Sequence, residues 1–195
     1  QSLNYSSKPE NFREAVIKGI SPDKGLYYPN KIKPLSKNFI NNLSKFHIHE
    51  IAFEAINQFI GNSIPELKLR SIIEDTLNFD FPLIKIEKQI FSLELFHGPT
   101  LAFKDVGARF MARCLEFFNK NSNERITVLV ATSGDTGAAV ANGFFNISGI
   151  DVVILYPKGK ISKIQEKQMT TLGGNISALE VDGVFDDCQE MVKKA

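Results

Sequence analysis

From residue 83 onward the sequence alternates short apolar runs with segments of helical periodicity. The runs comprise residues 83–86, 93–96, 127–131, 152–156 and 176–181. The last four runs are separated by helix-like segments at 105–119, 135–146 and 162–172. Strands that are apolar along nearly their whole length are typical of a parallel sheet with helices packed on its faces. The pattern therefore predicts an α/β domain.

The first part of the chain has a different pattern. Apolar residues recur at helical spacing over 12–20, 51–60 and 65–77, and turn-forming residues or glycine separate these segments. We therefore expect a mostly helical N-terminal domain over residues 1–82. The first part of the α/β region would then occupy residues 83–195.

The composition argues against several classes of function. Lys and Arg total 23 and Asp and Glu total 22, so the net charge of +1 gives no indication of a nucleic-acid or anionic-membrane partner. No run approaches the roughly 20 apolar residues that span a bilayer, and the polar start does not resemble a signal peptide. Cys114 and Cys188 lie far apart, which favours two reduced thiols over a disulfide or a metal site. We expect a cytoplasmic protein without a metal, and the sequence makes no prediction of oligomeric state.

The first segment with potential chemistry runs from Leu93 to Asp105. A predicted strand leads into a turn at Gly98, and a helix is predicted to begin at residue 103 or 104. Apolar neighbours and the positive end of a helix dipole both disfavour an ammonium group, so they would favour a nucleophilic amine on Lys104. The alternative is a lysine that simply reaches solvent. That alternative holds for most lysines, but the neighbouring Leu101 and Phe103 argue against it here.

The second segment is the turn that follows the apolar run 127–131. Its glycines let the backbone approach a ligand closely, and the free N–H groups of the next helix form an anion site. The hydroxyls of Ser133 and Thr136 add donors. The alternative is an ordinary N-cap at a tight connection, and the spacing alone does not decide between them. In an open parallel sheet ligands bind at the carboxyl ends of strands, where we expect both segments to lie.

Other candidates are weaker. The segment 159–162 resembles the end of a phosphate-binding P-loop, but Ile154 stands where the required glycine would be. The lysines of 157–160 follow a strand end and could contact a phosphate, although a solvated charged turn is the simpler interpretation. His47 and His49 are two residues apart, which disfavours a zinc pair. His97 could contact a ligand or complete a turn.

Four segments in order resemble threonine synthases of the microbial branch. These segments read EAVIKGISPDKGLYYP, LELFHGPTLAFKDVGARFMA, ATSGDTGAAVANGF and ILYPKGKISKIQEKQMTTLGGNI. The resemblance implies the tryptophan-synthase-β-like fold of pyridoxal 5'-phosphate (PLP) enzymes, known as fold type II. It also implies threonine biosynthesis by a carbon–oxygen lyase acting on phosphates, which converts O-phospho-L-homoserine and water to L-threonine and phosphate.

The resemblance assigns roles to individual residues. Lys104 matches the lysine that forms the Schiff base with PLP, and Asp135 would also contact the cofactor. Many relatives of this fold have Asn at the position of Asp135, whereas microbial threonine synthases have Asp. The loop that holds the substrate carboxylate corresponds to Ser133, Gly134, Asp135, Thr136 and Gly137.

The resemblance also implies a truncated chain, because the family's glycine-rich loop for the cofactor phosphate would lie beyond Ala195. We therefore expect the 195-residue chain alone to bind PLP poorly and to be inactive. One alternative is another PLP-dependent lyase or phospholyase of the same fold. HGPTLAFKD and the N-terminal helical domain argue against a dehydratase or a cysteine synthase. A second alternative, a non-catalytic binding protein on this fold, is disfavoured by the presence of Lys104 and SGDTG.

Overall fold

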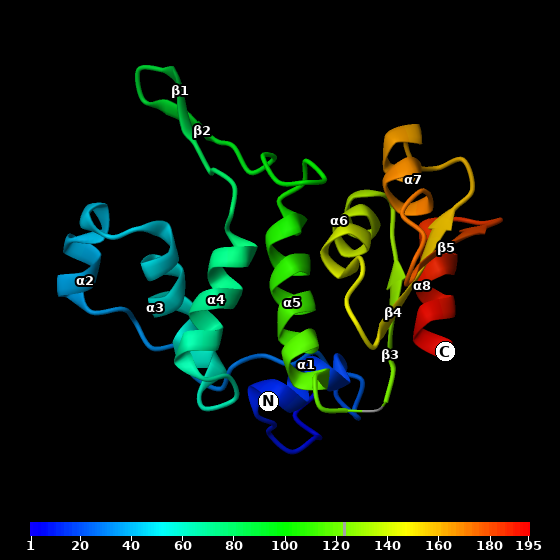
Figure 1. Cartoon of the computed structure of the whole chain (residues 1–195), viewed down its shortest axis with the longest axis horizontal. Helices are drawn as coiled ribbons and strands as arrows, with labels where there is room; N and C mark the ends of the chain where they lie inside the picture. The colour runs from blue at the N-terminus through cyan, green and yellow to red at the C-terminus, as the bar shows by residue number, and fades with distance from the viewer. Residues whose placement is uncertain (123) are drawn as a thin grey trace. The chain divides into compact units, whose positions relative to one another are not determined.

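The computed structural model describes residues 1–122 and 124–195, which form two compact units (Figure 1). The first unit comprises Gln1–Asn78 and the second comprises Phe79–Ala195. The division follows Asn78, whereas the change of sequence pattern placed it after residue 82. The candidate residues of the sequence analysis, Lys104 and 133–137, all belong to the second unit.

The first unit is mostly helical. Its elements are α1 (Phe12–Lys18), α2 (Lys37–Asn41), the short 3-10 helix η1 (Leu43–Lys45), α3 (Ile48–Ile60) and α4 (Glu66–Thr76). The side chains of Asn11 and Ser36 begin α1 and α2 by accepting a backbone N–H three residues further on. His47 begins α3, and its backbone N–H donates to Glu50 Oε2 over 2.9 Å. His47 is therefore the N-cap residue of α3.

Helices α3 and α4 carry most of the apolar core of this unit. The buried apolar residues on them are Phe53, Ile60, Leu69, Ile72 and Ile73. These positions follow the helical spacing seen in the sequence, which explains why α3 and α4 were predictable. Helix α2 and η1 were not predicted, because neither is long enough to show a periodic apolar pattern and neither buries a residue.

The second unit contains the expected parallel sheet with helices packed against it. Its elements are β1 (Leu83–Glu87), β2 (Ile90–Leu93), α5 (Lys104–Asn119), β3 (Ile126–Ala131), α6 (Asp135–Phe144), β4 (Ile150–Pro157), α7 (Lys163–Thr170), β5 (Ile176–Val181) and α8 (Phe185–Lys194). The parallel sheet has three strands in the order β3-β4-β5. The prediction of an α/β fold with a parallel sheet flanked by helices is confirmed.

The first two apolar runs do not join this sheet, so that part of the prediction was wrong. Strands β1 and β2 form a separate antiparallel hairpin in which Leu83 pairs with Leu93. Only Lys88 and Gln89 connect the strands, whereas a parallel crossover needs a dozen or more residues. The run 93–96 contributes only Leu93 to a strand, and the chain then continues irregularly to Lys104. The segment before Lys104 therefore does not follow a strand of the parallel sheet.

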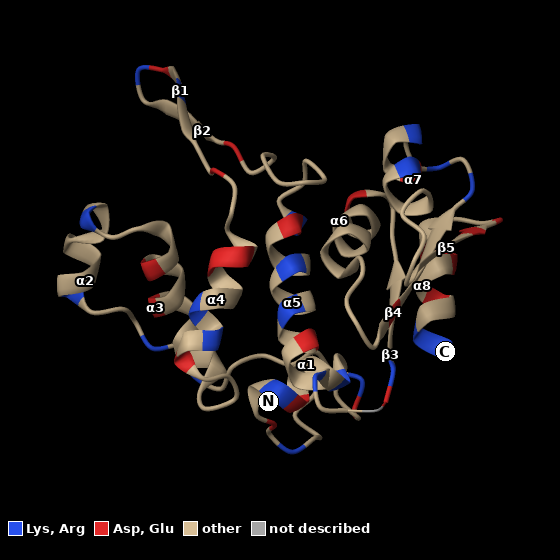
Figure 2. Cartoon of the chain, viewed as in Figure 1, with Lys and Arg blue, Asp and Glu red and all other residues tan. Residues whose placement is uncertain are grey.

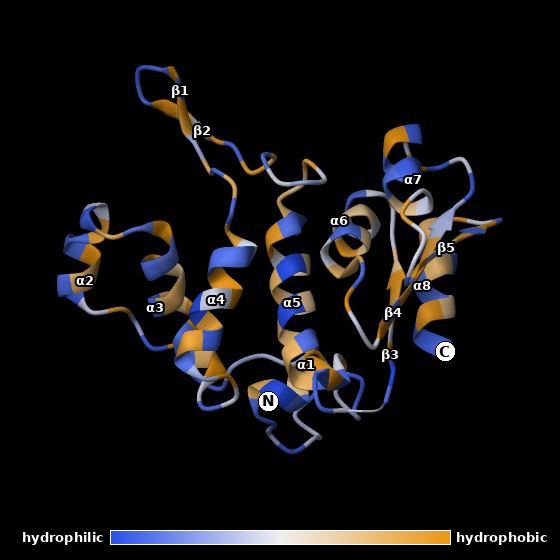
Figure 3. Cartoon of the chain, viewed as in Figure 1, coloured by the Kyte–Doolittle hydropathy of each residue, from blue (hydrophilic) through white to orange (hydrophobic). Residues whose placement is uncertain are grey.

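The core of the second unit lies between the parallel sheet and its helices. Strand β4 is its centre, with Ile150, Val152 and Ile154 fully buried, and Figure 3 colours β3 and β4 as mainly apolar. Helices α5 and α6 pack closely, because a Cβ on Gly143 of α6 would lie 3.1 Å from the backbone of α5. At the starts of the two helices, Lys104 Nζ of α5 lies 3.4 Å from Asp135 Oδ2 of α6. No helix of the described residues is both long and apolar enough to cross a membrane.

Candidate active site

Lys104 is the first residue of α5, as the sequence predicted, and a buried carboxylate holds the turn before it. Asp105 is only 1% exposed. It accepts hydrogen bonds from the backbone N–H of Thr100 over 2.9 Å and from the Thr100 hydroxyl over 2.5 Å. A Cβ on Gly98 would lie 2.5 Å from Asp105 Oδ2, so only glycine fits there. Through these hydrogen bonds Asp105 fixes the turn that precedes Lys104.

The expected apolar wall around the Lys104 amine is absent. Leu101 and Phe103 are 68% and 61% exposed, and the Lys104 side chain is 33% exposed. The amine lies 5.0 Å from the centroid of the Phe103 ring and 3.4 Å from Asp135 Oδ2. A ring face and a carboxylate both attract a cation. The sequence argument failed because it assumed that apolar neighbours in the sequence would be buried around the amine.

The turn before α6 is built around Thr132, a residue that the sequence analysis did not single out. Its side chain is buried, and its Oγ1 accepts hydrogen bonds from the backbone N–H groups of Gly134 and Gly137 over 2.9 and 2.8 Å. Gly134 is the N-cap residue, with φ of 136°, and makes no side-chain cap. The side chain that caps the start of α6 is therefore that of Thr132, and not that of Ser133 or Asp135. The sequence alone did not decide between a cap and a ligand site.

The remaining N–H groups at the start of α6 are available to a ligand. Those of Ser133, Asp135 and Thr136 donate no hydrogen bond to any other described residue, and the three side chains are exposed. Aligned N–H groups at the first turn of a helix favour an anion. The site can therefore hold a carboxylate or a phosphate oxygen.

The two glycines of this turn are needed for packing inside the protein. A Cβ on Gly137 would lie 2.4 Å from the sulfur of Met169 and 2.5 Å from Thr132 Cγ2. A Cβ on Gly134 would lie 2.5 Å from the amide of Gln165. From the sequence, these glycines are expected to let the backbone approach a ligand. In the structure they admit the side chains of α7 and of Thr132.

Asp135 connects the two segments that the sequence singled out. Its Oδ2 lies 3.4 Å from Lys104 Nζ, and its Oδ1 accepts a hydrogen bond from Gln165 Nε2 over 2.7 Å. Figure 2 shows charged residues at the start of both α5 and α6. Lys104 and the loop 133–137 thus come together on one side of the unit. Gln165 was not predicted to take part, although S-x-x-Q at 162–165 signals the start of α7.

The structure shows His97 in a local contact. Its Nε2 lies 2.6 Å from Glu94 Oε2, and its ring stacks on Phe96 with the centroids 4.9 Å apart. Of the two interpretations that the sequence left open, this arrangement favours the completed turn.

The residues present fit a pyridoxal cofactor. Such a cofactor needs a primary amine that its aldehyde can reach, polar groups beside its ring, and donors for the anionic groups of its substrate. The amine of Lys104, on a side chain that is one-third exposed, meets the first need, and the 52% exposed side chain of Asp135 meets the second. The unbonded N–H groups of Ser133, Asp135 and Thr136 meet the third.

Two family models and a set of relatives match the chain. Residues 80–195 match the model described as "Pyridoxal-phosphate dependent enzyme", and residues 1–77 match "Threonine synthase N terminus". A threonine synthase of Buchnera aphidicola subsp. Baizongia pistaciae is 47% identical over the whole chain, which covers 45% of that relative. The threonine synthase of Escherichia coli is 43% identical, with 100% of this chain and 45% of the relative covered.

Solved structures agree. The crystal structure of threonine synthase from Escherichia coli has a TM-score of 0.88 at 43% identity, covering 95% of this chain and 43% of that one. A PLP-bound threonine synthase from Brucella melitensis has a TM-score of 0.88 at 35% identity, covering 99% and 43%. The expected PLP-enzyme fold is confirmed, and the chain spans less than half the length of these threonine synthases. The chain belongs to the family of pyridoxal-phosphate-dependent enzymes, and over its whole length it is similar to the N-terminal portion of threonine synthases.

Proposed function

We propose that the full-length protein is a threonine synthase, which converts O-phospho-L-homoserine and water to L-threonine and inorganic phosphate. The proposal depends most on one observation. Lys104 Nζ and the Asp135 carboxylate are 3.4 Å apart, beside a helix start with unbonded N–H groups. The relatives that resemble this chain from its first residue to its last carry the name threonine synthase.

Lys104 is the residue that we propose to hold PLP, with Asp135 as a second contact to the cofactor. Bound PLP supplies an electron sink for the α carbon of an amino acid. The protein supplies orientation. Asp135, beside the amine, keeps Lys104 directed toward the space in front of the α6 turn.

The loop of Ser133, Gly134, Asp135, Thr136 and Gly137 is proposed to bind the substrate carboxylate. The N–H groups of Ser133, Asp135 and Thr136 would donate to its oxygens, together with the exposed hydroxyls of Ser133 and Thr136. Thr132 and the two glycines keep these donors in place. Holding the carboxylate fixes the direction of the α C–H bond, which favours its cleavage.

Lys104 is also the proposed proton carrier. The Lys104 amine would hold PLP in the resting protein and, once released from it, would be free to accept the α proton of the substrate. In the net reaction the Cγ–O bond breaks and phosphate leaves, one C–H bond at Cβ is replaced by a bond to the oxygen of water, and a proton is added at Cγ. A positioned base typically contributes 10²- to 10⁴-fold to such steps.

An assay of the full-length protein tests the proposal. We expect phosphate release and threonine formation from O-phosphohomoserine, and neither from serine. Lys104→Ala should lower turnover by roughly 10³-fold or more. Borohydride reduction followed by mass spectrometry should find a pyridoxyl group on Lys104. A keto acid in place of threonine would identify a phospholyase, and an unlabelled Lys104 would favour a non-catalytic binding protein.

A further inference from the structure

Helix α7 contacts both segments of the candidate active site through two glutamines. Gln165 Nε2 donates to Asp135 Oδ1 over 2.7 Å. One turn further on, Gln168 Nε2 donates to the backbone carbonyl of Thr100 over 3.4 Å, in the turn that precedes Lys104. The shorter bond goes to a carboxylate, and hydrogen bonds to charged groups are the stronger kind. We therefore expect the hydrogen bond from Gln165 to Asp135, more than that from Gln168, to affect the geometry of the site.

The amide of Gln165 is held in one orientation. Its Oε1 accepts hydrogen bonds from the backbone N–H of Ser162 over 3.2 Å and from the Ser162 hydroxyl over 3.0 Å. Ser162 is the N-cap of α7, and its Oγ accepts the N–H of Gln165 in return. With the oxygen occupied at the helix start, the NH₂ group faces Asp135. The capping box of α7 thus directs a donor at the site.

The α6 turn leaves room for this amide. A Cβ on Gly134 would lie 2.5 Å from both Cδ and Oε1 of Gln165. The φ of Gly134, 136°, also lies in a region that other residues avoid. Any side chain at position 134 would therefore displace the amide from Asp135.

The two oxygens of Asp135 have different partners. Oδ1 accepts from Gln165, and Oδ2 lies 3.4 Å from Lys104 Nζ. A half-exposed aspartate has several side-chain rotamers open to it, and the bond to Gln165 selects the one that turns Oδ2 toward the amine. We propose that Gln165 is a positioning residue that orients the Asp135 carboxylate and, through it, the Lys104 amine. This inference rests on the proposed function, which assigns Lys104 and Asp135 their roles.

The variant Gln165→Glu in the full-length protein separates this role from the capping role. Glutamate completes a capping box with Ser162 as glutamine does, but it places a carboxylate against Asp135 in place of a donor. Near neutral pH the two carboxylates repel, and at lower pH one shared proton restores a hydrogen bond. We expect kcat/KM at neutral pH to fall roughly 10- to 100-fold, and the loss to shrink on acidification.

The second readout does not use turnover. PLP is added to the protein without substrate, borohydride is added after a fixed time, and the fraction of Lys104 that carries a pyridoxyl group is measured by mass spectrometry. We expect Gln165→Glu to be labelled more slowly than wild type near neutral pH and to approach it on acidification. Gln165→Met removes the donor without adding charge, so its labelling should be slow at every pH.

Two control variants isolate the bond. Gln168→Glu adds the same charge to the same helix but faces a carbonyl oxygen, so its pH profile should keep the wild-type shape. Ser162→Ala removes the cap partner but leaves the Nε2 donor, so we expect a smaller loss of labelling rate than in Gln165→Met. Circular dichroism checks that each variant is folded.

Two outcomes would overturn the positioning role. One is a Gln165→Glu profile with the same shape as wild type, and the other is an equal shift in Gln168→Glu. Failure of the proposed function looks different. Wild-type protein would then form no threonine from O-phosphohomoserine, while the labelling of Lys104 would still report whether Gln165 positions the amine.

Discussion

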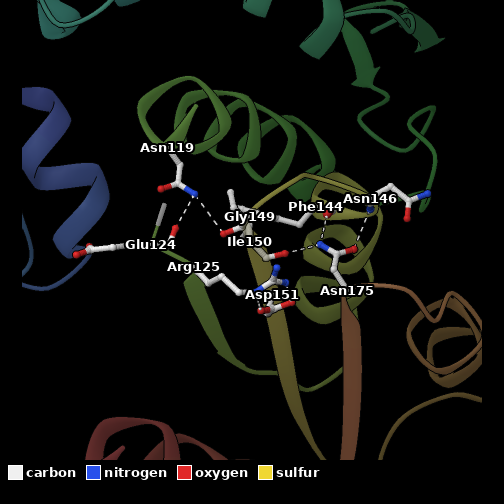
Figure 4. A network of polar contacts seen from close by, with 9 residues as sticks. All are labelled: Asn119, Glu124, Arg125, Phe144, Asn146, Gly149, Ile150, Asp151 and Asn175. Atoms are coloured by element: carbon white, nitrogen blue, oxygen red, sulfur yellow. Dashed lines mark hydrogen bonds and ion pairs between the residues drawn. The ribbon is translucent and has the colours of Figure 1, made fainter. Parts of the chain in front are cut away.

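The two ends of the parallel sheet differ in how far their polar groups are satisfied. At the amino ends of the strands, side-chain amides bind the backbone groups of the loops (Figure 4). Asn175 Nδ2 donates to the carbonyls of Phe144 and Ile150 over 2.9 and 2.8 Å, and its Oδ1 accepts the N–H of Asn146 over 2.8 Å. At the carboxyl ends, three N–H groups at the start of α6 have no partner among the described residues.

Asn119 extends the same pattern at the amino ends. It is 9% exposed, and its Nδ2 donates to the carbonyls of Glu124 and Gly149, each over 3.2 Å. Polar groups buried in a folded protein almost always find partners, as the buried Asn119 does here, whereas the residues with free N–H groups at the carboxyl ends are exposed. The two ends of the sheet therefore have different roles. The amino end holds the strands and loops together, and the carboxyl end keeps groups available for a ligand.

The largest expected effect on stability comes from Asn175→Ala. The substitution removes three hydrogen bonds at once, so we expect the free energy of unfolding to fall by about 2–4 kcal/mol. Because Asn175 lies at the amino ends of the strands and the candidate site lies at their carboxyl ends, KM for O-phosphohomoserine should stay the same. Denaturant unfolding and steady-state kinetics of the full-length protein measure the two effects.

Asn175→Asp sharpens this test, because it keeps the acceptor for Asn146 and loses both donor bonds. With the new carboxyl protonated its stability should fall between wild type and alanine, and with the carboxyl ionised its repulsion with the two carbonyls should lower the stability further. A rise of KM in parallel with the loss of stability would contradict the separate roles of the two ends of the sheet.

Compared with Asn175→Ala, Thr132→Val is expected to change the free energy of unfolding less and substrate binding at the candidate site more. Valine fills the same space but leaves the N–H groups of Gly134 and Gly137 without their acceptor, at a cost of about 1–2 kcal/mol. The α6 turn should loosen, so KM for O-phosphohomoserine should rise. Thr132→Ser keeps the hydroxyl and serves as the matched control. Unchanged KM in the valine variant would show that Thr132 supports the fold alone.

The sequence predicted most of the core around the parallel sheet. It predicted only part of the candidate site at the carboxyl ends of the strands. Strands β3, β4 and β5 were predictable because continuous apolar runs of this length are specific to buried strands. The start of α5 at Lys104 followed from the turn at Gly98. The hairpin β1–β2 was misplaced, although the alternation of Ile84, Lys85, Ile86 and Glu87 and the short connection both indicate antiparallel pairing.

The missed site residues share a physical reason. Gln165 lies thirty positions beyond Asp135, and its contact depends on where the chain places α7 after β4. Thr132 looks like one more hydroxyl in a polar turn, and only the backbone conformation shows that it accepts two N–H groups. Local pattern carries information on periodicity and on caps within a few residues. It carries none on which distant side chain reaches a given oxygen.

The smallest expected effect on stability comes from an exposed ion pair at the amino ends of the strands. Arg125 donates through Nε to Asp151 Oδ2 over 2.7 Å and through Nη2 to Oδ1 over 2.5 Å. These hydrogen bonds, opposed by some desolvation and reinforced by the charge of Arg125, lower the pKa of Asp151 below its ordinary value. The pair should matter little, because exposed ion pairs are screened by solvent.

The sign of its pH dependence follows from the lowered pKa. The stabilising contribution of Asp151 is fully present above the ordinary aspartate pKa of about 4, and it is lost as the pH falls through the lower pKa of the folded state. We expect Asp151→Asn to be slightly less stable than wild type at neutral pH and to match it in strong acid. Urea unfolding across this pH range, repeated at high salt, checks both points. If the two proteins still differed in stability in strong acid, the pair would act through packing. Its charges would then contribute nothing at the amino ends of the strands.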